Sequence, residues 1–271
     1  MTASRLRPVM AGAAFRIFVT PPAVALSYRL LRKTVADFAG ESDPNAHLVY
    51  EGESHVIMDL DGLVDGTTYH YSLYAWDGTT WSVAGASSGT PAATYADQGV
   101  DVLMLLRDRL EAGMRAELAA GRLRHPDGRI QVKTAPPQVK DSVPPLVTIQ
   151  LTSDAPSQRY LGEDIEGDDG FGEHEGWYSN VRLDVMGWSL NPDERNELRR
   201  ALKRIVLANM PVFDHEGLAL VEFSQQDTED FTTYAAPMYQ TMGTFTCQAP
   251  SQVAGGDYPV IAEIPMTINV K

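Results

Sequence analysis

The feature that most constrains the fold is a strand that leads through one turn into a capped helix, at residues 180–211 (NVRLDVMGWSLNPDERNELRRALKRIVLANMP). At its start, apolar Val181, Leu183 and Val185 alternate with Arg182, Asp184 and Met186. Successive side chains of a strand point to opposite faces, so this alternation predicts a half-buried strand. Trp188 falls on the face opposite the apolar set, where it either covers a second layer or lies in an interface.

The helix that follows carries clear start signals. Asn191 suits the N-cap, Pro192 suits the first helical position, and Glu194 completes a capping box. The helix is predicted to bury Leu198, Leu202, Ile205 and Val206 and to expose Arg195, Arg199, Arg200, Lys203 and Arg204. We expect Pro211 to end it. All of these local signals are structural, and none marks a catalytic site.

Two halves of the chain follow different patterns. From residue 14 to about 90, short β-branched and aromatic runs are separated by turn residues, which predicts an all-β sandwich whose first strand is weakly marked. Asp77-Gly78 between two such runs indicates a hairpin turn. Small residues at 85–99 indicate a boundary. We therefore predict a first domain over 1–92, a linker over 93–98 and a second domain over 99–271.

The second domain is predicted to be α+β, with a mostly antiparallel sheet and two covering helices. Its first helix places four apolar residues on one stripe and has Gly121 where a C-terminal cap belongs. The stripe contains Leu103, Leu106, Leu110 and Met114. Strands are expected at VTIQLTS, GLALVEF and MYQTMGTFTCQAP, and the prolines of APPQVKDSVPPL predict a loop.

Charge is unevenly distributed along the chain. The net charge is −14, and residues 142–271 contribute 8 basic and 20 acidic side chains, a balance of −12. This balance argues against direct nucleic-acid binding by the C-terminal half. The sequence contains no apolar run long enough to span a bilayer or to serve as a signal peptide, so we expect synthesis in the cytoplasm and no membrane association.

The most unusual composition is GEDIEGDDGFGEHEGW, at residues 162–177. It holds seven acids: Glu163, Asp164, Glu166, Asp168, Asp169, Glu173 and Glu175. Three readings stay open, namely a solvated acidic loop, a loop that docks onto a basic neighbour, and a loose calcium site. An EF-hand is excluded, because the required glycine is displaced and no helices flank the stretch. We predict no metal site, and we count these acids with Trp177 and Trp188 as candidates for a protein interface or a lumen.

No recognised catalytic or cofactor-binding motif occurs in the chain. The single cysteine, Cys247, is expected to be a buried hydrophobe within a strand, and the six histidines are unclustered. We therefore predict that the protein is not an enzyme and has no cofactor. An enzyme using the acidic stretch would need its carboxylates on rigid elements, whereas these lie among glycines.

Residues 63–75 (LVDGTTYHYSLYA) resemble the signature of fibronectin type III domains, with Asp65 at the usual position of proline. The resemblance covers residues 10–91 and gives Tyr69 the role of the tyrosine corner, whose hydroxyl bonds back to nearby backbone. We expect Tyr74, Trp76 and Trp81 to form an exposed aromatic face. Such a face suits sugars or partners, which motivates an alternative function as a carbohydrate- or cell-surface-binding module.

The second domain resembles the tail-terminator and tail-completion proteins of long-tailed bacteriophages. The likeness is carried by VRLDVMGWS, NPDERNELRRALKRIVLANMP, GLALVEFSQQDTED and YAAPMYQTMGTFTCQAP, in the family's order of elements. It implies a virion protein, assembled in the host cytoplasm, that forms a hexameric ring on the last ring of tail-tube protein. That ring would end tube polymerisation, join the tail to the head connector protein and let DNA pass through its lumen without specific binding. Another neck or baseplate structural protein is the alternative within the same class.

Overall fold

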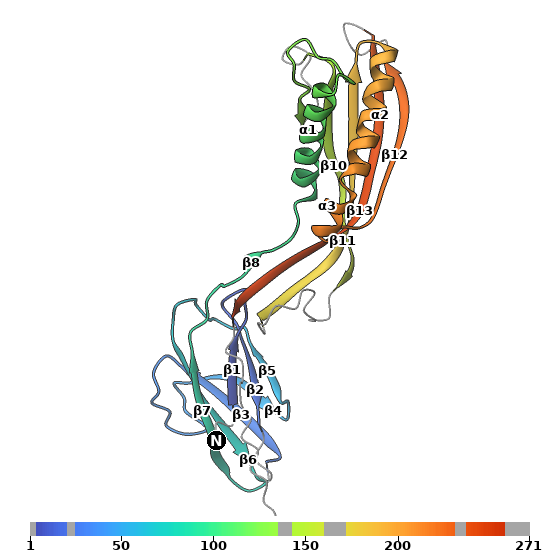
Figure 1. Cartoon of the computed structure of the whole chain (residues 1–271). Helices are drawn as coiled ribbons and strands as arrows, with labels where there is room; N and C mark the ends of the chain where they lie inside the picture. The colour runs from blue at the N-terminus through green and yellow to red at the C-terminus, as the bar shows by residue number, and fades with distance from the viewer. Residues whose placement is uncertain (1–3, 21–24, 135–142, 160–171, 231–236, 258–271) are drawn as a thin grey trace, which may run out of the picture. The chain divides into compact units, whose positions relative to one another are not determined.

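The structure is a computed structural model that describes residues 4–20, 25–134, 143–159, 172–230 and 237–257. The fold is mostly β, with small antiparallel sheets near the N-terminus followed by a curled, mixed half-barrel sheet with helices α1 and α2 (Figure 1). The chain forms two compact units, the first containing Met1–Ala96 and the second Asp97–Ile165 and His174–Val253. No helix within the described ranges is both long and apolar enough to cross a membrane.

Two antiparallel sheets form the first unit. One has the order β1-β2-β5, with β1 at Ser4–Pro8, β2 at Phe15–Val19 and β5 at Val56–Asp59. The other has the order β4-β3-β6-β7, with β4 at His47–Gly52, β3 at Ser27–Lys33, β6 at Tyr69–Trp76 and β7 at Trp81–Gly89. The sequence marked β1 weakly because its five residues, SRLRP, include two arginines and a proline.

The core of the first unit lies between these sheets. It buries Phe15, Ile17, Leu30, Ile57, Tyr71 and Leu73, which come from strands of both sheets. A polar group is buried with them, since Arg32 Nη1 donates to both carboxylate oxygens of Asp59 at 2.7 Å. The Tyr71 hydroxyl donates to the same carboxylate at 2.8 Å. Burial and the Asp59 charge raise the pKa of Tyr71 far above its usual value, so its hydroxyl stays protonated.

Two turns of this unit are held by hydrogen bonds between a side chain and nearby backbone. The Asp77 carboxylate accepts hydrogen bonds from the backbone N–H groups of Thr79 and Thr80, both at 2.8 Å, and these bonds lower its pKa. The turn joins β6 to β7 as a hairpin, as the sequence predicted. At the other turn, the Tyr69 hydroxyl accepts from the backbone N–H of Val64 at 3.0 Å. This is the bond to nearby backbone that the tyrosine corner requires.

The second unit is built on one curled sheet with the strand order β12-β13-β11-β10-β9. Its strands are β9 at Val132–Lys133, β10 at Leu146–Arg159, β11 at Gly172–Ser189, β12 at Ala219–Asp230 and β13 at Met238–Asp257. The short β8, Ala96–Asp97, also pairs with β13. β9 lies parallel to β10, whereas the pairs β10–β11 and β12–β13 are antiparallel.

Helices α1 (Val102–Ala119) and α2 (Pro192–Ala208) cover one face of this sheet beside each other (Figure 1). Their apolar faces share a core with alternate sheet residues, among them Leu106, Leu110, Leu202, Leu183, Val185 and Phe245. The helices approach closely because Gly113 of α1 faces Ile205 of α2, where any side chain on residue 113 would collide. The predicted stripe of α1 is largely right, although Leu103 is only partly buried.

Several elements differ from the sequence predictions. β10 and β11 are longer than expected, and β11 begins at Gly172, inside the stretch predicted to be an acidic loop. Pro211 does not end the helix that begins at Pro192. That helix ends at Ala208, and Pro211 lies in the first turn of a further helix, α3 (Met210–His215), where its missing N–H costs no hydrogen bond. The loop predicted for APPQVKDSVPPL falls largely outside the described residues.

Candidate functional site

The sheet of the second unit has one face without helices, and its composition is the most suggestive feature of the molecule. Successive residues of a strand point to opposite faces, and one set of each strand packs against α1 and α2. The other set therefore forms the face without helices. Its members are Glu222, Ser224, Gln226, Thr228 and Asp230 of β12, Gln240, Met242, Thr244, Thr246 and Gln248 of β13, and Arg182, Asp184 and Met186 of β11. We call this set the polar sheet face; at one end of the same face lies a small apolar cluster of Leu146, Trp188 and Met238. The polar sheet face is dominated by uncharged polar residues and contains one basic side chain, Arg182, which lies 4.0 Å from Asp184.

The same sheet has open edges on both sides. Among the described residues, no strand pairs with the outer edge of β12, and β9 covers β10 only at Val147 and Thr148. β10 beyond that point, residues 150–159, is exposed throughout. Unpaired backbone N–H and C=O groups along such edges can pair with another chain. The sheet therefore offers two long edges for association.

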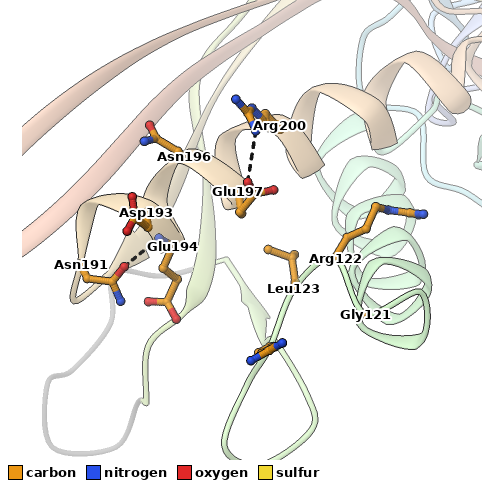
Figure 2. A pocket seen from close by; sticks show the side chains of 10 residues that line it. Gly121, Arg122, Leu123, Asn191, Asp193, Glu194, Asn196, Glu197 and Arg200 are labelled. Atoms are coloured by element: carbon orange, nitrogen blue, oxygen red, sulfur yellow. Dashed lines mark hydrogen bonds and ion pairs between the residues drawn. The ribbon is translucent and has the colours of Figure 1, made fainter.

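A hollow of about 620 Å³ lies where the end of α1 meets the start of α2 (Figure 2). It is lined by Gly121, Arg122, Leu123 and Arg124 and by Asn191, Asp193, Glu194, Asn196, Glu197 and Arg200. The Asn191 side chain accepts from the backbone N–H of Glu194 at 2.8 Å and so caps α2. The Glu194 carboxylate accepts from the backbone N–H of Leu190 at 3.4 Å, one residue earlier than a standard capping box would place this bond.

The polar groups of this hollow are occupied by structural bonds. Burial raises the pKa of Glu194, but its carboxylate already serves the helix start. Arg200 pairs with Glu197 at 3.2 Å, and Arg122 pairs with Glu117 behind the hollow at 2.8 Å. The described residues that line the hollow include no serine, threonine, cysteine, lysine or histidine.

Glu117 is the one buried carboxylate of α1, and it joins both helices. It accepts from Arg204 of α2 at 2.6 Å and from Arg122 at 2.8 Å. The hydrogen bond from Arg204 lowers the pKa of Glu117 to about 2, against the opposing effect of burial and with help from Arg122. The sequence showed Glu117 only as an acid in a helix, because its two partners are brought together by folding.

The exposed arginines of α2 are also paired across the fold. Arg195 lies 3.0 Å from Glu229 and 3.6 Å from Asp227 of β12, and Arg199 lies 3.7 Å from Asp227. The helix was predicted to present these residues as an exposed basic face. Arg195 is instead largely covered, because the sheet supplies acids beside it. The pairing removes much of the apparent basic character of α2.

Most of the acidic stretch falls outside the described residues. This holds for Glu163, Asp164, Glu166, Asp168 and Asp169. The backbone of Glu173 lies within β11, and Glu175 forms an ion pair with Arg159 of β10 at 2.8 Å. Glu175 is therefore a strand residue and not part of a loop.

Two predicted interface tryptophans differ in exposure. Trp177 is 46% exposed, and its indole N–H donates to Ser179 Oγ at 3.1 Å. Trp188 is only 6% exposed within the chain, which agrees with the alternative that it covers a second layer. Its ring packs with Leu146 and Met238 on the face away from the main core, and its N–H donates to Thr148 Oγ1 at 3.0 Å.

The predicted aromatic face of the first unit is only partly present. Tyr74 is 4% exposed, which corrects the prediction that it lies open on the surface. Its cross-strand neighbour on β3 is Arg29, whose Nη1 donates to the Glu41 carbonyl at 3.1 Å. Trp76 and Trp81 remain half-buried with ring centres 5.4 Å apart, and the Arg29 guanidinium lies 4.7 Å above Trp81.

Within the described residues, no group of three or more His, Cys, Asp or Glu side chains is arranged to hold a metal ion. Cys247 is buried in β13, and this burial raises the pKa of its thiol to about 12. A thiol protonated at neutral pH is a poor nucleophile, so Cys247 acts as a core residue.

Comparisons with known proteins add no assignment. No protein-family model matches the chain, and no curated protein matches it. The polar sheet face and the two open edges are therefore the features from which function has to be argued.

Proposed function

We propose that this protein is a structural virion protein that caps the head-proximal end of a bacteriophage tail tube as a ring. In this role it ends tube polymerisation and forms the joint to the head connector protein. The observation that carries the proposal is the sheet of the second unit, which combines open edges on both sides with a polar face that holds few charges.

The two edge strands of the sheet, β12 and β10, run in directions that allow copies to join into a ring. The pairs β10–β11 and β12–β13 are antiparallel. β11 and β13 also run oppositely, because Ser179 bonds to Ser251 and Ser189 to Tyr239. β12 and β10 therefore run in opposite directions. Copies related by rotation about an axis along the strands would place β12 of one copy antiparallel to β10 of the next. Antiparallel pairing needs no connecting segment, and head-to-tail contacts close into rings when the rotation permits.

The polar sheet face supports a passage for DNA. In a ring closed at the sheet edges, α1 and α2 would lie on the outside and this face would line the lumen. Threonine, serine and glutamine side chains offer no lasting attraction to phosphates, and the only basic group of the set lies beside Asp184. DNA binding is dominated by Lys and Arg contacts to phosphates, so such a surface would let DNA slide without holding it.

The finer fold assignment belongs to the same proposal. We infer that the first unit is a fibronectin type III-like sandwich, supported by its β1-β2-β5 and β4-β3-β6-β7 sheets and by the Tyr69 bond. The second unit is the α+β, tail-terminator-like domain. In the assembled neck the sandwich would decorate the outside of the ring.

The mass of the purified protein in solution tests the proposal. Light scattering and negative-stain images are expected to show rings of several copies, alone or after tail-tube protein is added. A monomer that ignores tube protein would contradict it. A sugar-binding module would instead be supported by glycan-array signals that depend on Trp76 and Trp81, the aromatic pair that stays partly exposed.

A further inference from the structure

The outer face of the β1-β2-β5 sheet is basic and apolar, although the chain is strongly acidic. In the register of these strands, Arg5 stands opposite Phe18, and Phe18 opposite Val56. In the next outward row, Arg7 stands opposite Arg16, and Arg16 opposite Met58. The alternate residues of β2 and β5 are buried, so these six side chains point away from the core. We call them the arginine face.

Two charges of this face are not balanced by neighbouring acids. The first 95 residues contain six basic side chains, and three of these, Arg29, Arg32 and Lys33, form ion pairs elsewhere in the unit. The other three lie on the arginine face, where Arg5 and Arg16 form no ion pair with any described residue. The unit thus places half of its basic residues on one sheet face.

The register of the face brings like charges together. Arg7 and Arg16 are direct cross-strand neighbours. Like charges opposite each other destabilise a sheet by up to about 1 kcal/mol, because their side chains lie close together on one face. A carboxylate bound at Arg16 would offset this repulsion, since arginine binds carboxylates through two parallel hydrogen bonds.

The apolar residues of the face indicate a protein partner. Val56 is 51% exposed and Met58 is 42% exposed, and Leu60, just beyond β5, is 66% exposed. Arginine and exposed apolar side chains together are typical of interface cores. Three arginines are too few for strong phosphate binding by a chain of net charge −14, so nucleic acid fits this face poorly.

We propose that the arginine face binds the acidic stretch, Glu163–Glu175, of a second copy of the chain. This stretch, EDIEGDDGFGEHE, carries seven acids and interleaves them with the apolar Ile165 and Phe171. Its charge and its apolar side chains complement those of the face. Two different surfaces that complement each other on identical chains can form a head-to-tail contact, which repeats from copy to copy. The inference does not depend on the proposed tail function.

The first test measures binding of a labelled peptide of residues 162–177. The receptor is the full-length chain in which all seven acids are replaced by their amides, so that its own stretch does not compete. We expect saturable binding at low salt that weakens at least tenfold when Arg5→Gln and Arg16→Gln are added. The matched control is Arg115→Gln with Lys203→Gln, which removes the same charge from two exposed helix positions and is expected to change binding less than twofold.

Equal binding by the face variant and the control variant, or no peptide binding at all, would overturn the inference. Circular dichroism melts of all variants establish that each is folded before binding is compared. A peptide with its acids replaced by amides is expected to lose binding, which shows that charge carries the contact.

The second test identifies the partner as another copy. One full-length chain carries Arg5→Gln and Arg16→Gln, and the other carries the seven amide replacements. Each variant by itself lacks one side of the contact and is expected not to associate through it. The mixture contains one intact arginine face and one intact acidic stretch, and sedimentation velocity is expected to show a salt-sensitive complex. Peptide binding without complex formation in the mixture would show that the contact forms within one chain, and the proposed partner would then be wrong.

Discussion

Arg204 of α2 donates to the carboxylate of Glu117 on α1 at 2.6 Å, and this carboxylate is buried between the two helices. Arg122, just after α1, donates to the same group at 2.8 Å. The three side chains fasten the end of α1 to the middle of α2. Since the helices cover the sheet that we assign to the ring, their attachment is a condition for the proposed assembly.

Removal of this carboxylate is expected to weaken the second unit. Glu117→Ala should lower the free energy of unfolding by about 3 kcal/mol, because Arg204 and Arg122 lose their common partner. Urea unfolding followed by circular dichroism measures the change. Glu111→Ala is the control, since its ion pair with the exposed Arg129 should contribute less than about 1 kcal/mol. Equal losses in the two variants would contradict the special role of Glu117.

The same carboxylate predicts an acid-dependent loss of stability. The pKa of Glu117 is lowered from 4.5 to about 2 in the folded chain, so its charged form stabilises the fold. That stabilisation is fully present above the unfolded value of 4.5 and is lost as the pH falls towards 2. Unfolding curves measured from pH 6 to pH 2 should therefore converge for wild type and Glu117→Gln at the acid end. A constant difference across this range would rule out the titration of Glu117 as its cause.

In the first unit, Asp59 is expected to be the most sensitive polar residue. Asp59→Ala leaves the Arg32 guanidinium and the Tyr71 hydroxyl buried without their acceptor, and should cost about 3–5 kcal/mol of stability. Thermal melting of the full chain, with the two units resolved by calorimetry, measures the loss. Asp61→Ala serves as the comparison, because the Asp61 side chain is 83% exposed and only its backbone carbonyl accepts from Arg32.

The close contact of α1 and α2 gives a test of packing. Alanine favours helices over glycine by about 1 kcal/mol, yet Gly113→Ala should destabilise the unit because the new methyl group collides with Ile205. We expect a loss of about 1–3 kcal/mol, as for other overpacked cores. In an Ile205→Ala background, which lacks the γ-carbons that the new methyl group would meet, Gly113→Ala should cost less than it does in the wild type. Stabilisation by Gly113→Ala alone would show that the helices separate easily.

Pairing of the sheet edges is testable by disulfide trapping. In a Cys247→Ser background, Gln226→Cys in β12 and Thr152→Cys in β10 should cross-link copies into a ladder that ends at a closed species on oxidation. Within one chain the two strands are separated by β13 and β11, about 14 Å at ordinary strand spacing, so a disulfide cannot form internally.

Positions along each strand are to be scanned in pairs, because the register between copies sets which cysteines meet. The control replaces Gln226→Cys with Thr244→Cys, which lies on β13 inside the sheet and two strands away from β10. A ladder formed equally by the control would indicate random collisions and not edge pairing.

Local signals were sufficient where the determinants lie close together in sequence. The N-cap Asn191 and Pro192 at the start of α2, the hairpin at Asp77 and the burial of Cys247 all follow from a few neighbouring residues, and the structure confirms them. The alternation of Val181, Leu183 and Val185 also identified the buried face of β11 correctly.

The remaining features depend on contacts between distant residues. Tyr74 alternates as an outward residue, but it is buried in the folded chain beside Arg29, which binds the distant Glu41 carbonyl. β10 continues past its apolar residues because β11 pairs with it as far as Arg159, which no local pattern reveals. β1 is an edge strand that contains two arginines, so its composition does not predict a strand. Its pairing with β2 is visible only in the folded chain. The sequence did not predict the arginine face, because its residues come from three strands that only folding brings together.

The alternating directions of β12, β13, β11 and β10 have a consequence for the size of any assembly joined at their outer edges. Each copy contributes an even number of long strands, so every joint repeats the same antiparallel match and no copy has to be inverted. Hydrogen bonding then favours no particular number of copies. The bend at each joint sets that number, so substitutions that change the bend would alter the diameter of the assembly while leaving the fold of each copy intact.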